Sequence, residues 1–147
     1  MIFLRTLQVA IPFIWFGAVG AISFMEAPLK FTAPNVTIPL GVGIGQVVFH
    51  MLNRIEIVLC LMFAFTLAIV RPRSRTAVII FAFTAAVLIF QTFWLFPLLD
   101  ERSSAVISGT ADPFSRLHIV YIIADSIKLL ALLGLGFALV IRKLHTE

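Results

Sequence analysis

Four apolar runs, each long enough to cross a lipid bilayer, occupy most of this 147-residue chain. They cover about residues 7–25, 47–70, 76–99 and 118–141, and about 20 apolar residues in a helix span the hydrocarbon layer. Only 12% of the residues are charged, whereas about a quarter are charged in a typical globular protein. The sequence therefore predicts an all-α integral membrane protein, with a single domain formed by a bundle of four transmembrane helices.

Basic residues gather at one end of the predicted bundle. They precede the first run, separate the second from the third and follow the fourth, at Arg5, at Arg71, Arg73 and Arg75, and at Arg142 and Lys143. The other two links carry acidic and basic residues in similar numbers. This pattern predicts that both termini lie in the cytoplasm and that the chain is a multi-pass protein of the cytoplasmic (plasma) membrane, with an uncleaved first span. It also argues that the net charge of +4 reflects topology and not nucleic-acid binding.

Charged and amide side chains interrupt three of the runs at one depth. Counted at 1.5 Å per residue from the cytoplasmic ends, Arg54, Gln91 and Asp125 lie at about 24 Å. Glu56 and Lys128 lie at about 20 Å. Because an unpaired charge in lipid is costly, we expect ion pairs. By depth, Arg54 fits opposite Asp125 and Glu56 opposite Lys128. Arg54 and Glu56 are two residues apart and point to nearly opposite sides of the helix, so the two pairs cannot both be ideal. Asp125 could instead pair with Lys128 within one helix, and Arg54 or Lys128 could extend to the outer interface.

Helical periodicity places these residues on two polar stripes that should face the bundle interior. The stripes, together with Gln91 and the outer end of the first helix, give the candidate site residues His50, Asn53, Arg54, Glu56, Gln91, His118, Tyr121, Asp125, Lys128 and Glu26. One hypothesis is an outward-facing polar pocket between helices 2, 3 and 4 that binds or passes a small solute, ion or proton. In this hypothesis Glu56 and Asp125 accept a proton or cation and Arg54 and Lys128 supply counter-charge, and a conducting form would be an oligomer because four short helices make a thin wall. The alternative is a structural or assembly subunit whose polar layer clasps the helices.

A second alternative is a haem-bearing electron carrier. His50 and His118 fall at similar depths, about 30 and 34 Å by the same count, and two imidazoles on parallel helices can be axial ligands. Apart from this possibility, we expect no metal or cofactor. The sequence contains no metalloprotease helix and no nucleophile elbow, so an enzyme is not expected.

The link between the first two runs is rich in proline and glycine. Pro28 and Pro34 predict the end of the first helix. The alternating Gly41, Gly43 and Gly45 predict a flexible or re-entrant lead into the second helix.

A weak internal repeat is visible at an offset of 69 residues. Phe24, Pro28 and Leu29 recur as Phe93, Pro97 and Leu98, and the same offset takes Glu56 to Asp125. The pattern suggests two parallel helix pairs related by duplication.

Three segments carry a resemblance to known sequences. They are Ile22 to Pro34 (ISFMEAPLKFTAP), Leu40 to Gly45 (LGVGIG) and Leu52 to Glu56 (LNRIE). Over roughly the N-terminal half, the chain resembles a set of small uncharacterised bacterial four-span membrane proteins. The Ala-Pro exit from the first helix and the histidine-bearing start of the last helix also loosely resemble a wider family of four-span proteins of unknown function. The resemblance implies the four-span topology and points to Glu26, Asn53 and Glu56, but it implies no activity, substrate or cofactor.

Overall fold

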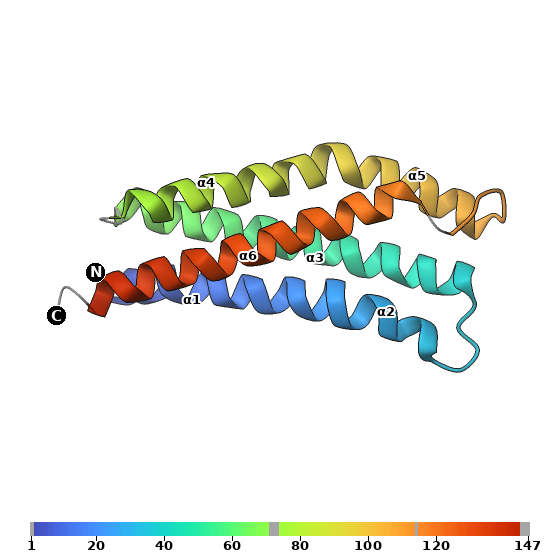
Figure 1. Ribbon diagram of the computed structural model, residues 1–147, viewed down its shortest axis with the longest axis horizontal. Helices are drawn as coiled ribbons and strands as arrows, with labels where there is room; N and C mark the ends of the chain where they lie inside the picture. Colours follow the sequence, from blue (N-terminus) through green and yellow to red (C-terminus); the bar gives the residue numbers. More distant parts are fainter. Residues whose placement is uncertain (1, 71–73, 114, 145–147) are drawn as a thin grey trace.

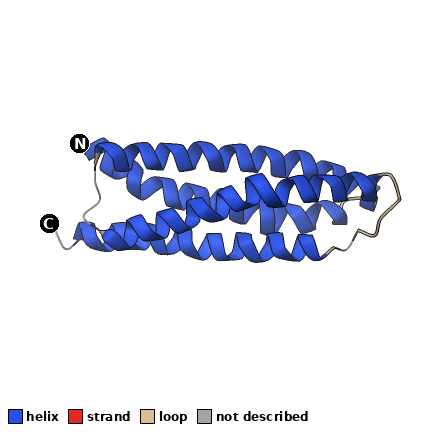
Figure 2. Ribbon diagram, turned by 90° about the horizontal axis from the view of Figure 1, so that it is seen from above, coloured by secondary structure: helices blue, strands red, loops and turns tan. Residues whose placement is uncertain are grey.

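Four long helical rods lie side by side and form an elongated bundle (Figures 1 and 2). The structure is a computed structural model that describes residues 2–70, 74–113 and 115–144, with side chains described as far as residue 141. Both ends of the chain lie at the same end of the bundle (Figure 1). Each rod is long and apolar enough to cross a membrane, which confirms the predicted all-α four-span architecture. The basic residues Arg71 and Arg73 lie outside the described residues.

Two of the four rods change helix type along their length. The first rod consists of α1 (Ile2–Val19), the π-helix η1 (Gly20–Glu26), α2 (Ala27–Leu29) and the 3₁₀-helix η2 (Lys30–Thr32). The third consists of α4 (Arg75–Phe90), the π-helix η3 (Gln91–Leu95) and α5 (Phe96–Ile107). The second and fourth rods are the continuous helices α3 (Ile38–Ile69) and α6 (Arg116–Leu144).

At the end of the bundle far from the chain termini, the helical rods are longer than the apolar runs predicted. The first reaches Thr32, the second begins at Ile38 and the third continues to Ile107, so the predicted helix stop at Pro28 was wrong. Pro28 and Pro97 each lie in the first turn of a new α-helix, directly after a π-helix. Proline removes one backbone donor and collides with the carbonyl four residues earlier, and the wider π turn relieves that collision.

The glycine-rich start of the second rod is regular helix, not the flexible lead that we predicted. Thr37 caps α3 by accepting a hydrogen bond from the Leu40 backbone nitrogen. The glycines allow close packing against the first rod. A Cβ on Gly41 would collide with the Phe31 ring, and one on Gly45 would lie 2.7 Å from Lys30 Nζ. The α2–η2 end therefore packs tightly onto α3.

The two halves of the chain repeat the same plan. The π-helices η1 and η3 precede Pro28 and Pro97, which are 69 residues apart. Buried positions follow the same offset, and the pairs are Trp15 with Thr84, Val19 with Leu88, Leu52 with Tyr121, Glu56 with Asp125, and Phe63 with Leu132. This agreement of buried positions and helix breaks supports the predicted duplication of a helix pair.

The end of the bundle nearer the termini has a closed apolar core. Its centre is formed by large buried side chains from all four rods, namely Ile11, Trp15, Leu59, Phe63, Leu88 and Leu132. Large apolar side chains also project outward, including Val47 at 72% exposed and Phe93 at 78% exposed. A surface of this kind is suited to lipid contact.

Candidate functional site

Lys128 of α6 is the centre of a buried polar network. Its side chain is fully buried, and its Nζ lies 2.5 Å from Glu56 Oε1 and 3.0 Å from Asp125 Oδ1. It also donates a hydrogen bond of 2.7 Å to Gln91 Oε1. Gln91 in turn donates to Asp125 Oδ1 at 2.8 Å. Helices α3 and α6 and the π-helix η3 are thus joined through one ammonium group.

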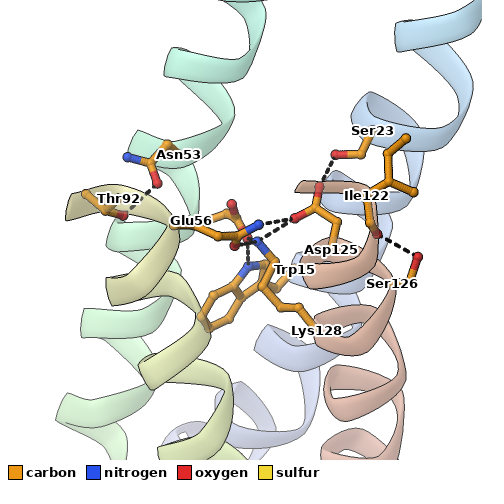
Figure 3. A network of polar contacts seen from close by, with 10 residues as sticks. Trp15, Ser23, Asn53, Glu56, Thr92, Ile122, Asp125, Ser126 and Lys128 are labelled. Carbon is orange, nitrogen blue, oxygen red and sulfur yellow. Dashed lines mark hydrogen bonds and ion pairs between the residues drawn. The ribbon is translucent and has the colours of Figure 1, made fainter. Parts of the chain in front are cut away.

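The first rod completes this network through two residues that the sequence analysis did not identify. Trp15 Nε1 of α1 donates to Glu56 Oε1 at 2.8 Å, and Ser23 Oγ of η1 donates to Asp125 Oδ2 at 2.5 Å. Figure 3 shows the two donors approaching the carboxylates from the same rod. A buried indole usually finds an acceptor for its N–H, so Trp15 in an apolar run was a usable signal. Ser23 offered none.

The network contains more negative than positive groups. Glu56 and Asp125 converge on the single ammonium of Lys128. The predicted pair between Glu56 and Lys128 is confirmed, as is the pair within α6. The predicted pair between Arg54 and Asp125 is wrong, because Arg54 is exposed on the outer face of α3. Arg54 lies two residues from Glu56, so it points to nearly the opposite side of the helix.

Two smaller polar contacts lie beside the network, toward the end of the bundle far from the termini. Thr92 Oγ1 donates to Asn53 Oδ1 at 2.9 Å (Figure 3). His50 Nε2 lies 3.0 Å from Asp100 Oδ2 on α5, and Gln46 donates to the other oxygen of that carboxylate. The predicted stripe of His50, Asn53 and Glu56 is therefore divided among three separate contacts.

A cavity of about 600 Å³ lies at the end of the bundle far from the termini. All four rods bound it, whereas the predicted pocket lay between helices 2, 3 and 4. Its wall is mainly apolar and includes the rings of Phe24, Phe31, Phe49 and Phe96. The polar and charged residues on its wall are Ser23, Lys30, Gln46, Asp100, Arg102, Ser103, Ser115, His118, Tyr121 and Asp125.

Asp125 connects the cavity to the buried network. It lines the cavity and bonds to Ser23, Gln91 and Lys128. Glu56 and Lys128 are absent from the cavity wall. The network therefore closes the inner end of the cavity, and the apolar core lies beyond it.

Two buried polar atoms on the cavity wall lack a hydrogen-bond partner. Within the described part of the chain, Tyr121 Oη and Arg102 Nε are the buried side-chain nitrogen or oxygen atoms without a hydrogen bond of standard geometry. The Tyr121 hydroxyl nevertheless lies close enough to Ser23 and Asp125 to interact with both. Tyr121 is only 4% exposed and packs between Phe49 and Phe96. Arg102 makes one hydrogen bond, of 2.9 Å from Nη2 to the Asp112 backbone oxygen. Buried donors without a protein partner are rare, so both atoms are available to a water molecule or a ligand in the cavity.

The predicted site residues thus fall into separate groups. His118, Tyr121 and Asp125 line the cavity. Glu56, Gln91 and Lys128 belong with Asp125 to the buried network. Glu26 pairs with Lys30 at 3.4 Å. The cavity residues that the sequence analysis missed are chiefly Ser23, Lys30 and Arg102.

The two histidines of the haem hypothesis do not face a common space. His118 lines the cavity, whereas His50 lies against Asp100 and Phe96 and is not part of the cavity wall. Within the described residues, no group of three or more histidine, cysteine, aspartate or glutamate side chains is arranged to hold a metal ion.

Comparisons with known proteins add no assignment to this geometry. No protein-family model, no curated protein and no solved structure matches the chain.

Proposed function

We propose that this four-helix membrane protein is a non-enzymatic binding protein, and that it takes up a small solute in the cavity from the outer side of the membrane. The observation that carries the proposal is the cavity of about 600 Å³, whose inner part is lined by Tyr121 and Asp125. Ligand sites are typically of this size, mainly apolar, and supplied with a few polar groups. The outward direction rests on the positive-inside distribution of the basic residues.

Because the inner end of the cavity is closed, the structure is better suited to binding a solute than to passing one across the membrane. Below Asp125, the side chains of Glu56 and Lys128 are in direct contact. Beyond them, the core of Trp15, Phe63 and Leu132 is almost completely buried. A solute or proton would therefore stop at the network in this conformation.

A second candidate function, a structural helix clasp, is favoured by a different observation. Lys128 is fully buried and bonds to groups on three rods, and buried polar groups can fix the register in which helices pack. The clasp and the cavity occupy adjacent layers of the bundle and share Asp125. The proposal therefore assigns the clasp to the network and ligand binding to the cavity above it.

The binding proposal can be tested by filling the cavity. Val42 lies on the cavity wall, so Val42→Trp should occlude it. Val47 projects outward and is 72% exposed, so Val47→Trp adds the same side chain on the same helix without reaching the cavity.

The readout is mass spectrometry of small molecules that are retained by protein extracted from its native membrane. We expect wild type and Val47→Trp to carry the same solute and Val42→Trp to lack it. Equal retention by all three proteins, or no retained solute in wild type, would contradict the proposal.

A further inference from the structure

The acidic groups on the cavity wall already have partners. Both carboxylate oxygens of Asp125 are bonded, Oδ1 to Lys128 and Gln91 and Oδ2 to Ser23. Asp100 is held by Gln46 and His50. The surplus negative charge of the network would favour a cation, but Glu56 does not line the cavity. A cationic ligand would therefore share these carboxylates with their existing partners.

The donors on the same wall are less completely used. Tyr121 Oη and Arg102 Nε are buried without a partner, and no described carboxylate forms an ion pair with Arg102. Lys30 has a 3.4 Å contact with Glu26, and its Nζ lies 5.3 Å from the centre of the Phe49 ring and 5.6 Å from that of Phe31. The cavity thus presents a hydroxyl without a hydrogen bond of standard geometry, a guanidinium without an ion pair and a weakly paired ammonium.

The spacing of these donors defines the shape of a ligand. Phe96 of α5 packs against Tyr121 with ring centres 5.9 Å apart. Arg102 lies six residues farther along α5, which is about 9 Å along a helix. The wall between the two levels is largely aromatic and aliphatic, and the one carboxylate of α5 on it, Asp100, is bonded to Gln46 and His50. A ligand that satisfies both donors must carry two acceptor groups separated by an apolar body.

From this arrangement we infer that the cavity binds an amphipathic anion. Its carboxylate or phosphate lies at Arg102 and Lys30, its apolar body lies along the phenylalanine rings, and a neutral acceptor such as a carbonyl oxygen receives the hydrogen bond of Tyr121. The inference rests on the proposed binding function and specifies its ligand class. Charge-assisted hydrogen bonds to Arg102 would supply the preference for an anion.

The test uses three probes that share an aromatic ketone and carry an anionic, a neutral or a cationic substituent. 4-Benzoylbenzoate carries a ketone and a carboxylate on an aromatic body, 4-benzoylbenzamide is its neutral analogue and 4-(aminomethyl)benzophenone is cationic. Binding to the full chain in nanodiscs of zwitterionic lipid is measured by calorimetry. Near-ultraviolet light then attaches the ketone to neighbouring C–H groups, and peptide mass spectrometry locates the attachment. We expect the anion to bind about tenfold more tightly than the other two probes and to label residues of the cavity wall.

Three variants assign the effect to particular side chains. Arg102→Gln should remove the tenfold preference for the anion. Arg116→Gln removes the same charge at the same end of the bundle from an exposed residue outside the cavity wall, and it should retain the preference. Tyr121→Phe should weaken all three probes about fivefold, because each contains the ketone. Thermal unfolding of each variant shows whether it is folded.

The possible outcomes test the proposed ligand class separately from the proposed binding site. Cavity labelling with equal or tighter binding of the cationic probe would overturn the inference and leave the proposed binding function standing. No binding of any probe, or labelling outside the cavity alone, would overturn both. Repeating the titration in nanodiscs rich in phosphatidylglycerol distinguishes two sources of the same chemistry. If phosphatidylglycerol competes with the anionic probe, the natural ligand is an anionic lipid. If it does not compete, the natural ligand is a free solute.

Discussion

Lys128 Nζ of α6 lies 2.5 Å from Glu56 Oε1 of α3, and both side chains are buried among apolar residues in the middle of the bundle. Asp125 contacts the same ammonium from one turn earlier in α6. One cation therefore holds two carboxylates, and the three residues are not equivalent in their contribution to stability.

Removing Lys128 should cost more stability than removing Glu56. Lys128→Met leaves two buried carboxylates without a cation, and we expect a loss of about 3–5 kcal/mol in the free energy of unfolding. Glu56→Gln leaves a balanced pair between Lys128 and Asp125, so the loss should be about 1–2 kcal/mol. Reversible unfolding in detergent, followed by circular dichroism, measures both values.

Arg54→Gln is the matched control for these variants, because Arg54 lies two residues from Glu56 on the exposed face of α3. We expect a change within about 0.5 kcal/mol. A loss from Arg54→Gln as large as that from Lys128→Met would mean that Arg54 belongs to the network after all.

Trp15 and Glu56 should be energetically coupled. The indole N–H donates to the carboxylate at 2.8 Å, and this bond ties α1 to α3. Trp15→Phe, Glu56→Gln and the double variant form a cycle that isolates the interaction, and we expect a coupling free energy of about 1.5–3 kcal/mol. Additive effects of the two substitutions would show that the bond contributes nothing beyond the packing of the ring.

Gly41 and Gly43 should respond in opposite ways to alanine. Both lie in α3 and gain the same helix propensity, about 1 kcal/mol at most. A Cβ at Gly41 collides with the Phe31 ring, whereas one at Gly43 meets its nearest neighbour, Ile107 Cδ1, at an ordinary 3.8 Å. We expect Gly43→Ala to raise the thermal unfolding midpoint and Gly41→Ala to lower it. Similar increases in both would show that Phe31 moves aside at little cost.

The four-span fold could be predicted because the apolar runs are long and the polar interruptions few. The pairing of Glu56 with Lys128 was also accessible, since depth along a helix follows from counting residues. The side of the helix on which the Arg54 side chain lies was harder to predict. Depth alone placed it with Asp125, but its position two residues from Glu56 excludes a shared face.

Other parts of the site depend on packing that no local pattern specifies. The π-helix η1 presents Ser23 to Asp125. The chain then continues as helix through Pro28 because the π turns absorb the strain, and this brings Lys30 to the cavity wall. Gln8, which donates to the Thr66 and Val70 backbone oxygens at the end of α3, was missed because the acceptors are 58 and 62 residues away along the chain. The cavity itself requires all four rods, so single-helix periodicity could not reveal its extent.

The most direct test of an outward cavity with a closed inner end is cysteine labelling with a membrane-impermeant maleimide. In a Cys60→Ala background, His118→Cys places a thiol on the cavity wall and Phe63→Cys places one in the closed core. We predict that His118→Cys reacts when reagent is added from outside intact cells, and that Phe63→Cys reacts from neither side of the membrane. Labelling of His118→Cys from the cytoplasmic side alone, or of Phe63→Cys from outside, would contradict the account.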